Sequence, residues 1–128
     1  RRITEVPGAS NYFLEGCITY SNEAKIRTLD VPRVTIESFG AVSPETAEAM
    51  ALGMLKRSGS DHAISVTGIA GPDGGSEEKP VGTVYIGYAK GDKTRSIRVV
   101  LPGDRYLIRW RASQAALDYL RRQMLKTA

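Results

Sequence analysis

The sequence predicts an α/β domain in which a mixed β-sheet is covered by helices on both faces. In the first part of the chain, apolar β-type segments alternate with amphipathic helical segments. Two β-type segments separated by a Gly-Asp turn then follow, and a long helical segment ends the chain. Strands joined through helices favour parallel neighbours, whereas a tight turn joins antiparallel ones. A length of 128 residues suits one domain whose core needs no disulfide or metal.

The composition is typical of a soluble globular protein, with 41% hydrophobic and 25% charged residues. Cys17 is the single cysteine, and its place in an apolar run predicts a buried thiol in preference to a nucleophile. One cysteine excludes a disulfide within the chain and favours a reducing compartment. No apolar run approaches the roughly 20 residues of a membrane span and no signal peptide is visible, so we expect a cytoplasmic protein.

Basic residues gathered in the C-terminal segment account for the net charge of +4. They are Arg105, Arg109, Arg111, Arg121, Arg122 and Lys126. Their pattern is typical of a solvated helix face, and aromatic residues do not alternate with them as a platform for single-stranded nucleic acid requires. We therefore expect no nucleic-acid partner, and a modest positive charge suits a small anionic ligand equally well.

The first β-type segment is residues 12–19, which are rich in aromatic and β-branched side chains and follow a turn signal at 7–10. This composition predicts a strand. Residues 1–5 are then interpreted as the end of an earlier helix, so we expect the domain to begin upstream of Arg1.

A short helix is predicted after this strand. Ser21 or Asn22 caps its start, and it runs to about Leu29. Asn22 and Lys25 are three residues apart, so they share one face of the helix. Residues 32–39 form either an irregular or a helical connection.

A longer helix is predicted from Ser43, its cap, through Pro44 at the first helical position to about Arg57. Apolar residues at spacings of three and four indicate that one face packs on a sheet. They are Ala47, Met50, Ala51, Met54 and Leu55. Residues 58–60 end this helix, and residues 61–66 form the next strand.

A hairpin follows, with strands at 81–90 and 94–101 joined by a turn at 91–92. Residues 102–104 open a long C-terminal helix. The apolar stripe that we expect to face the core comprises Leu107, Trp110, Ala115, Leu117, Leu120 and Met124.

The junction at residues 66–75 is the first candidate for a ligand site, because a β-type segment runs straight into a glycine-dense loop. Glycines let the backbone approach a ligand and turn its amides inward, and Thr67 adds a hydroxyl at the rim. The glycines concerned are Gly68, Gly71, Gly74 and Gly75. A flexible connection without a ligand is the alternative interpretation.

Six short motifs occur in order along the chain. They are Pro-Gly-Ala-Ser at 7–10, Tyr-Ser-Asn-Glu-Ala-Lys at 20–25, Gly-Ala-Val-Ser at 40–43, Val-Thr-Gly-Ile-Ala-Gly-Pro at 66–72 with Gly-Gly at 74–75, Lys-Pro-Val-Gly-Thr-Val at 79–84 and Pro-Gly-Asp-Arg at 102–105. In these motifs the chain closely resembles the CinA C-terminal domain family, the nicotinamide mononucleotide deamidases. The resemblance implies a single domain over residues 1–128, built as a three-layer α/β/α sandwich with a mixed, mainly parallel sheet.

The resemblance also implies an amidohydrolase of pyridine nucleotide salvage, which converts nicotinamide mononucleotide and water to nicotinic acid mononucleotide and ammonia. In the family, a strand and a Ser-x-Glu-Ser-Cys-Thr-Gly-Gly type motif supply the presumed nucleophilic serine, and residues 1–128 contain no such motif. We expect this motif, its strand and the start of the first helix to lie upstream of Arg1. A molecule without them is expected to be inactive, a nucleotide-binding or regulatory module linked to competence or DNA damage.

Amide hydrolysis by a serine needs a base, donors for the oxyanion and a proton source for the departing ammonia. His62, the one histidine, begins a strand and is expected at an edge or on the surface, so a Ser-His-Asp triad is not favoured. Lys25 is the candidate base, provided that burial or a nearby cation lowers its pKa. Apart from the resemblance, it would be interpreted as a solvated helix lysine. Tyr20 is a candidate to relay a proton or orient Lys25, with a core tyrosine as the alternative.

The remaining candidates bind substrate. Thr67 and the amides of the glycine loop would hold either the oxyanion or the ribose phosphate. Arg105 lies at a helix start, where an anion gains from both the guanidinium and the helix N-terminus. Asp104 is predicted to cap that helix, and Asn22 is a further substrate-binding candidate. No Cys, His or carboxylate cluster has the spacing of metal ligands, so we expect neither metal nor other cofactor. Homo-oligomer formation is left open.

Overall fold

A three-stranded antiparallel sheet forms the centre of the computed structural model, which describes residues 1–127. Its strands are β1 (Ala63–Gly68), β2 (Thr83–Lys90) and β3 (Lys93–Val100), in the order β1-β2-β3. Ala63 lies opposite Ala89 in the first pair, and Thr83 lies opposite Val100 in the second. The central strand β2 is buried along almost its whole length, as a strand covered on both faces should be.

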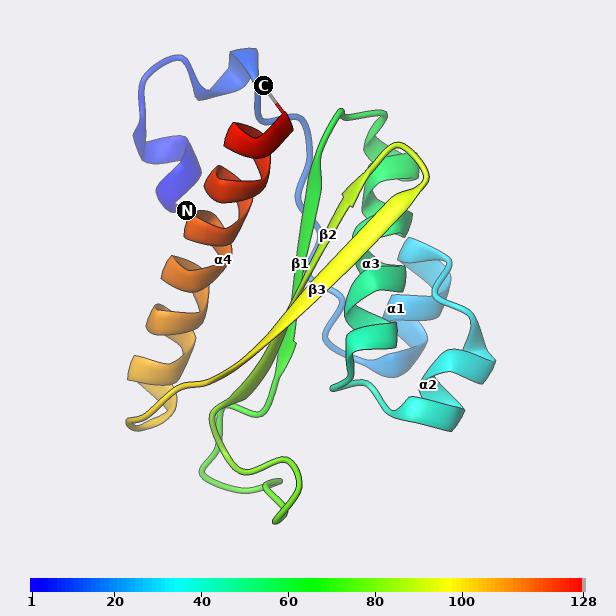
Figure 1. The fold of residues 1–128 in the computed structure, drawn as a ribbon, viewed down its shortest axis with the longest axis vertical. Helices are drawn as coiled ribbons and strands as arrows, with labels where there is room; N and C mark the ends of the chain where they lie inside the picture. Colours follow the sequence, from blue (N-terminus) through cyan, green and yellow to red (C-terminus); the bar gives the residue numbers. More distant parts are fainter. Residues whose placement is uncertain (128) are drawn as a thin grey trace.

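Helices cover both faces of this sheet (Figure 1). They are α1 (Asn22–Leu29), α2 (Arg33–Phe39), α3 (Pro44–Ser58) and α4 (Arg105–Thr127), with two 3₁₀ turns, η1 (Arg2–Glu5) and η2 (Ala9–Asn11). On one face, α3 packs on the sheet with α1 and α2 outside it. On the other face lies α4, and a separate apolar cluster fills each side. The predicted α/β class with helices on both faces is confirmed.

The expectation of a mainly parallel sheet is wrong for these three strands, since both pairs are antiparallel. A parallel pair needs a crossover, usually a helix, and none lies between the strands. The glycine loop instead closes at its base, where the Ile69 N–H donates to the Thr83 carbonyl at 2.9 Å and the Gly82 N–H donates to the Ile69 carbonyl at 2.7 Å. The turn at 91–92 closes the hairpin between β2 and β3 as predicted.

The start of α3 is determined by its cap. Ser43 Oγ accepts from the Thr46 N–H at 3.2 Å, proline follows at the first helical turn, and Gly59 ends the helix with a φ of 66°. All five residues predicted for its core face are buried, which confirms the stripe. In the same way, Ser21 Oγ caps α1 by accepting from the Ala24 N–H at 3.1 Å.

The predicted core face of α4 is partly wrong. Its buried residues are Ile108, Ala112, Ala116, Tyr119 and Gln123, which also recur at spacings of three and four. Leu107, Trp110 and Met124, which we expected in the core, are exposed. The helix carries apolar residues over more than one face, so periodicity alone does not decide which face meets the sheet. The predicted cap is confirmed, because Asp104 Oδ1 accepts from the Leu107 N–H at 2.9 Å.

The strand predicted at residues 12–19 is also wrong, because this segment pairs with no strand among residues 1–127. Its apolar side chains face solvent, and Ile18 is 94% exposed. Cys17, which we expected to be buried, is only half-buried. β-branched and aromatic composition favours a strand only where a neighbour supplies the hydrogen bonds.

Candidate functional site

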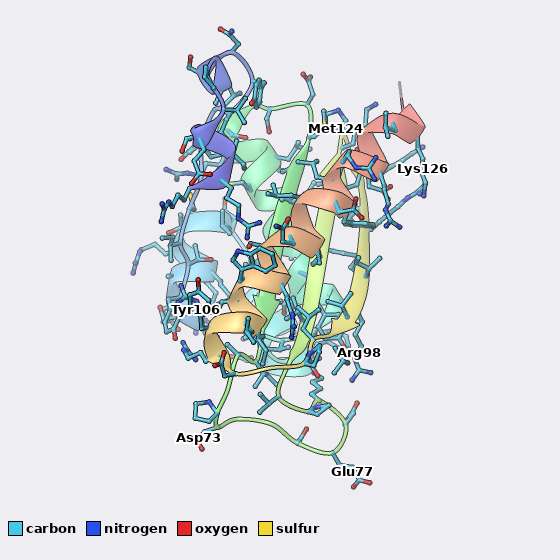
Figure 2. All side chains as sticks on the ribbon, turned by 90° about the vertical axis from the view of Figure 1, so that its left-hand side faces the viewer. Asp73, Glu77, Arg98, Tyr106, Met124 and Lys126 are labelled. Atoms are coloured by element: carbon cyan, nitrogen blue, oxygen red, sulfur yellow. The ribbon has the colours of Figure 1, made fainter. Side chains whose placement is uncertain are left out.

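Three candidate segments meet at one end of the sheet. The loop at residues 69–82 extends beyond the C-terminal end of β1, and the N-terminus of α4 lies at the same end (Figure 1). Figure 2 shows Asp73 and Glu77 at the far side of this loop, away from the sheet, with Tyr106 on the first turn of α4. The turn between residue 20 and α1 supplies the third segment.

The glycines of the loop serve its own packing. Gly71 is buried with a φ of +79°, and a Cβ there would lie 2.5 Å from Val81 Cγ1. At Gly75 a Cβ would lie 2.8 Å from the Val81 backbone nitrogen. The outgoing and returning halves of the loop therefore contact each other so closely that only glycine fits at these two positions. Gly74 is exposed, and Gly68 is the last residue of β1.

Lys25 is buried, with 6% of its surface exposed, which rules out the solvated helix lysine. Its Nζ donates to the Thr19 carbonyl at 2.8 Å and to the Tyr20 carbonyl at 3.4 Å. Burial lowers the pKa of Lys25, because desolvation penalises the charged ammonium. Both acceptors are neutral, so they compensate the loss of hydration less than a carboxylate would.

Arg105 connects the glycine loop to the segment before α1. Its Nη1 donates to the Gly71 carbonyl at 2.8 Å, and its Nη2 donates to the Tyr20 hydroxyl at 3.2 Å. Tyr20 is 83% exposed, so the alternative of a core tyrosine is wrong. Through its carbonyl and its hydroxyl, Tyr20 contacts both Lys25 and Arg105, and the structure thus brings these three predicted residues together.

Thr67 lies apart from that group. It is buried, and its Oγ1 donates to the Ala41 carbonyl at 2.7 Å, toward the turn at residues 40–43. The hydroxyl proton is thereby used, so Thr67 retains only acceptor capacity and is poorly suited to stabilise an oxyanion. Asn22, the first residue of α1, is exposed.

Lys79 is a residue whose role the sequence did not indicate. Its Nζ donates to the Val42 carbonyl at 2.7 Å and to the Phe39 carbonyl at 3.4 Å, so it ties the glycine loop to the turn at 40–43. Both Lys79 and that turn belong to the six motifs, and this membership was the only sequence signal that could have pointed to a role for Lys79.

No group of three or more His, Cys, Asp or Glu residues among residues 1–127 is placed to hold a metal ion. In the same part of the chain, no helix combines the length and the apolarity needed to cross a membrane. His62 contacts Tyr88, with 2.8 Å between Nδ1 and the hydroxyl oxygen, and it takes no part in the group around Lys25.

The fold and site define an α/β domain with a buried lysine and an arginine-anchored glycine loop at one end of its sheet. The CinA C-terminal domain model matches residues 1–124, and the chain belongs to this family. A CinA-like protein of Geotalea uraniireducens is 55% identical over 125 residues, which are 98% of this chain and 30% of that protein. A putative competence-damage inducible protein of Alkaliphilus metalliredigens is 51% identical over 125 residues, with the same coverage.

Two solved structures of competence/damage-inducible proteins are similar to this chain in fold and sequence. The competence/damage inducible protein of Agrobacterium tumefaciens is 41% identical with a TM-score of 0.88, over 92% of this chain and 73% of that one. The competence damage-inducible protein A of Klebsiella pneumoniae is 31% identical with a TM-score of 0.91, over 96% and 76% of the two chains. The chain spans about a third of the length of the curated relatives it matches.

Proposed function

We propose that this domain hydrolyses the amide of nicotinamide mononucleotide, giving nicotinic acid mononucleotide and ammonia in pyridine nucleotide salvage. The observation that carries the proposal is the burial of Lys25, which lowers its pKa and thereby raises the fraction of the neutral amine, the form that can accept a proton. Membership of the family supports the assignment. A serine from a segment upstream of Arg1 would be the nucleophile, and we infer a cytoplasmic enzyme that uses no metal.

The hydrogen bonds of Lys25 suit a base. A neutral amine has two N–H donors and one lone pair, and the Thr19 and Tyr20 carbonyls accept both donors. The lone pair is then left to take the serine proton as the serine oxygen attacks the amide carbon. Transfer of that proton to the amide nitrogen lets ammonia leave, and water then hydrolyses the acyl-enzyme in the same way.

Arg105 is the proposed anion-binding residue. Its guanidinium has five N–H donors, and the Gly71 carbonyl and the Tyr20 hydroxyl accept one each from Nη1 and Nη2. The remaining donors are available to the ribose phosphate, together with amides of the glycine loop. If the loop amides hold the oxyanion instead, Arg105 acts by positioning the loop.

We expect Arg105→Ala to raise KM for nicotinamide mononucleotide about 10- to 100-fold with a smaller change in kcat, since a charge-assisted hydrogen bond contributes about 1.5–3 kcal/mol. Steady-state kinetics measures both constants. Arg109→Ala is the matched control, because Arg109 is exposed one turn further along α4 and should leave both constants unchanged. A fall in kcat at constant KM would assign the loop to the oxyanion and remove Arg105 from phosphate binding.

A nucleotide-binding or regulatory module linked to competence or DNA damage is the second candidate. It is favoured by the name of a relative, a putative competence-damage inducible protein that is 51% identical to this chain. Incubating the purified protein with nicotinamide mononucleotide, and measuring both ammonia and ligand binding, separates the two. Ammonia release supports the hydrolase, whereas binding without ammonia, in a protein that carries the serine, supports the module.

A further inference from the structure

Two of the six motifs contribute no residue to the group around Lys25. They are Gly-Ala-Val-Ser at 40–43 and Lys-Pro-Val-Gly-Thr-Val at 79–84. Lys79 Nζ connects these two motifs by donating to the Val42 carbonyl at 2.7 Å, across 37 residues of sequence. Since Lys79 lies on the returning half of the glycine loop, it holds a segment that is a candidate for substrate binding.

The turn that accepts from this lysine is fixed from two sides by buried hydroxyls. The Gly40 carbonyl accepts from Ser43 Oγ at 3.0 Å and from Thr46 Oγ1 at 2.7 Å. The neighbouring Ala41 carbonyl accepts from Thr67 Oγ1 of β1 at 2.7 Å. All three hydroxyl-bearing residues are buried, so these bonds cannot be replaced by water while the turn stays in place. The turn is therefore a rigid support, tied to both α3 and β1.

The returning half of the loop depends on two contacts for its position. Residues 72–78 are all exposed, and Lys79 is half-buried. A small turn closes on this lysine, because the Ser76 N–H donates to the Lys79 carbonyl at 2.9 Å and the Lys79 N–H donates to Ser76 Oγ at 3.0 Å. Arg98 Nη2 donates to the Glu78 carbonyl at 2.7 Å, and Figure 2 shows Arg98 at the end of the sheet from which the loop extends.

Three cations thus anchor the loop through neutral carbonyls. Arg105 holds the outgoing half at the Gly71 carbonyl, whereas Arg98 and Lys79 hold the returning half. A hydrogen bond from a charged donor is roughly twice as strong as one between neutral groups. A carbonyl does not neutralise the cation that binds it, so positive charge is kept beside the amides of the loop. This arrangement suits a loop that receives an anion.

We propose that Lys79 is a positioning residue for the substrate: by clamping the returning half of the glycine loop to the turn at 40–43, it holds the loop amides and Arg105 ready for one phosphate. This inference rests on the proposed function. Lys79 acts through the loop and leaves the base, Lys25, unaffected. Without the clamp, the loop would have to be ordered each time substrate binds, and that cost would weaken binding.

Lys79→Met in the protein that carries the serine tests the clamp, since methionine keeps the apolar stem and removes the donors. KM for nicotinamide mononucleotide should rise at least about tenfold, with kcat changed less than about twofold, because one charge-assisted hydrogen bond is lost and the chemistry is not touched. Lys79→Arg restores a charged donor and should bring KM back to within about threefold of the wild-type value. Steady-state kinetics measures both variants.

Two matched controls separate the clamp from general effects of charge. Glu77→Gln changes an exposed charge on the same loop, and Lys93→Met makes the same substitution at an exposed lysine beside the turn at 91–92, the opposite end of the sheet. Both should keep the wild-type KM. A raised KM in Lys79→Met that returns to the wild-type value in about 1 M salt, with the loop still ordered, would assign Lys79 to long-range attraction and overturn the proposal.

Loop order is measured directly by NMR relaxation without substrate. In Lys79→Met, the order parameters of the amides at 73–78 should fall from the rigid range, about 0.85, to below about 0.6. The Ile69 and Gly82 amides, which are bonded at the base of the loop, are internal controls and should change little. If Lys79→Met does not fold, Lys79→Gln takes its place in both experiments.

Unchanged order parameters, or an unchanged KM and kcat, in a folded Lys79→Met protein overturn the proposal. Loss of loop order with a lower kcat at constant KM retains the clamp and assigns the loop to the oxyanion. If the wild-type protein releases no ammonia, the relaxation data still decide for Lys79. Loss of loop order together with weaker binding of nicotinamide mononucleotide, measured by calorimetry, would then retain the clamp and remove the hydrolase.

Discussion

Lys25→Met is expected to lower the turnover of nicotinamide mononucleotide at least about 100-fold in the protein that carries the serine, because a general base contributes about 10²- to 10⁴-fold. Methionine keeps the length and apolar stem of the lysine but has no proton acceptor of comparable basicity. The loss should therefore appear in kcat, with KM little changed. Steady-state ammonia release measures it.

Lys56→Met is the matched control for this experiment, since Lys56 is exposed on α3, away from the sheet end. It should keep wild-type turnover. Circular dichroism and thermal unfolding of both variants establish that the fold is retained. Wild-type activity in a folded Lys25→Met protein would remove Lys25 from the mechanism.

The pH dependence of the rate follows from the lowered pKa of Lys25. As the proposed base, Lys25 acts as the neutral amine, so kcat/KM should rise as pH passes through its pKa, which lies below 10.5, and level off above it. The unfolded chain binds more protons between the lowered pKa and 10.5, so the free energy of unfolding should also rise with pH across that window. In the Lys25→Met variant, both the rise of kcat/KM and the rise of the free energy of unfolding across this pH window should be absent.

Ile86→Ala is expected to lower the free energy of unfolding by about 2–5 kcal/mol, the range for deleting a fully buried aliphatic side chain. Ile86 lies at the middle of the central strand, is 0% exposed and packs in the cluster with Ile108 and Tyr88. Neighbours on both strands and on α4 limit how far the cavity can collapse. Urea unfolding followed by circular dichroism measures the loss.

Ile18→Ala is the matched control, with the same substitution at a side chain that is 94% exposed. In the chain of residues 1–128, we expect a change within about 0.5 kcal/mol. Equal destabilisation by the two substitutions would contradict the assignment of β2 to the centre of the core.

Local signals predicted the helices and the hairpin. The caps at Ser21 and Ser43 lie where the sequence places them, and both strands of the hairpin agree within two residues. Residues 12–19 show the limit of such signals, because their composition favours a strand while pairing depends on a distant neighbour. The expectation of a mainly parallel sheet failed for a related reason. The relative direction of β1 and β2 depends on whether the glycine loop makes a crossover or a hairpin-like return, and the local sequence does not determine this.

The candidate site was only partly predictable. Lys25 was found through a recognised motif, but its burial depends on the segment before α1, whose Thr19 carbonyl accepts a hydrogen bond from its Nζ. Tyr20 and Arg105 are 85 residues apart in sequence, and only the tertiary fold brings the hydroxyl and the guanidinium together. The bond from Thr67 to Ala41 likewise crosses from the sheet to a turn that precedes α3. No periodicity in the sequence encodes such contacts.

We propose that this end of the sheet hydrolyses an amide, with Lys25 as the base. Ammonia release from nicotinamide mononucleotide, measured in parallel for the serine-containing wild-type protein and its Lys25→Met variant, tests it most directly. We predict steady release by the wild type and at least about a 100-fold slower release by the variant. No release by a folded wild-type protein, or equal release by both proteins, would contradict the account.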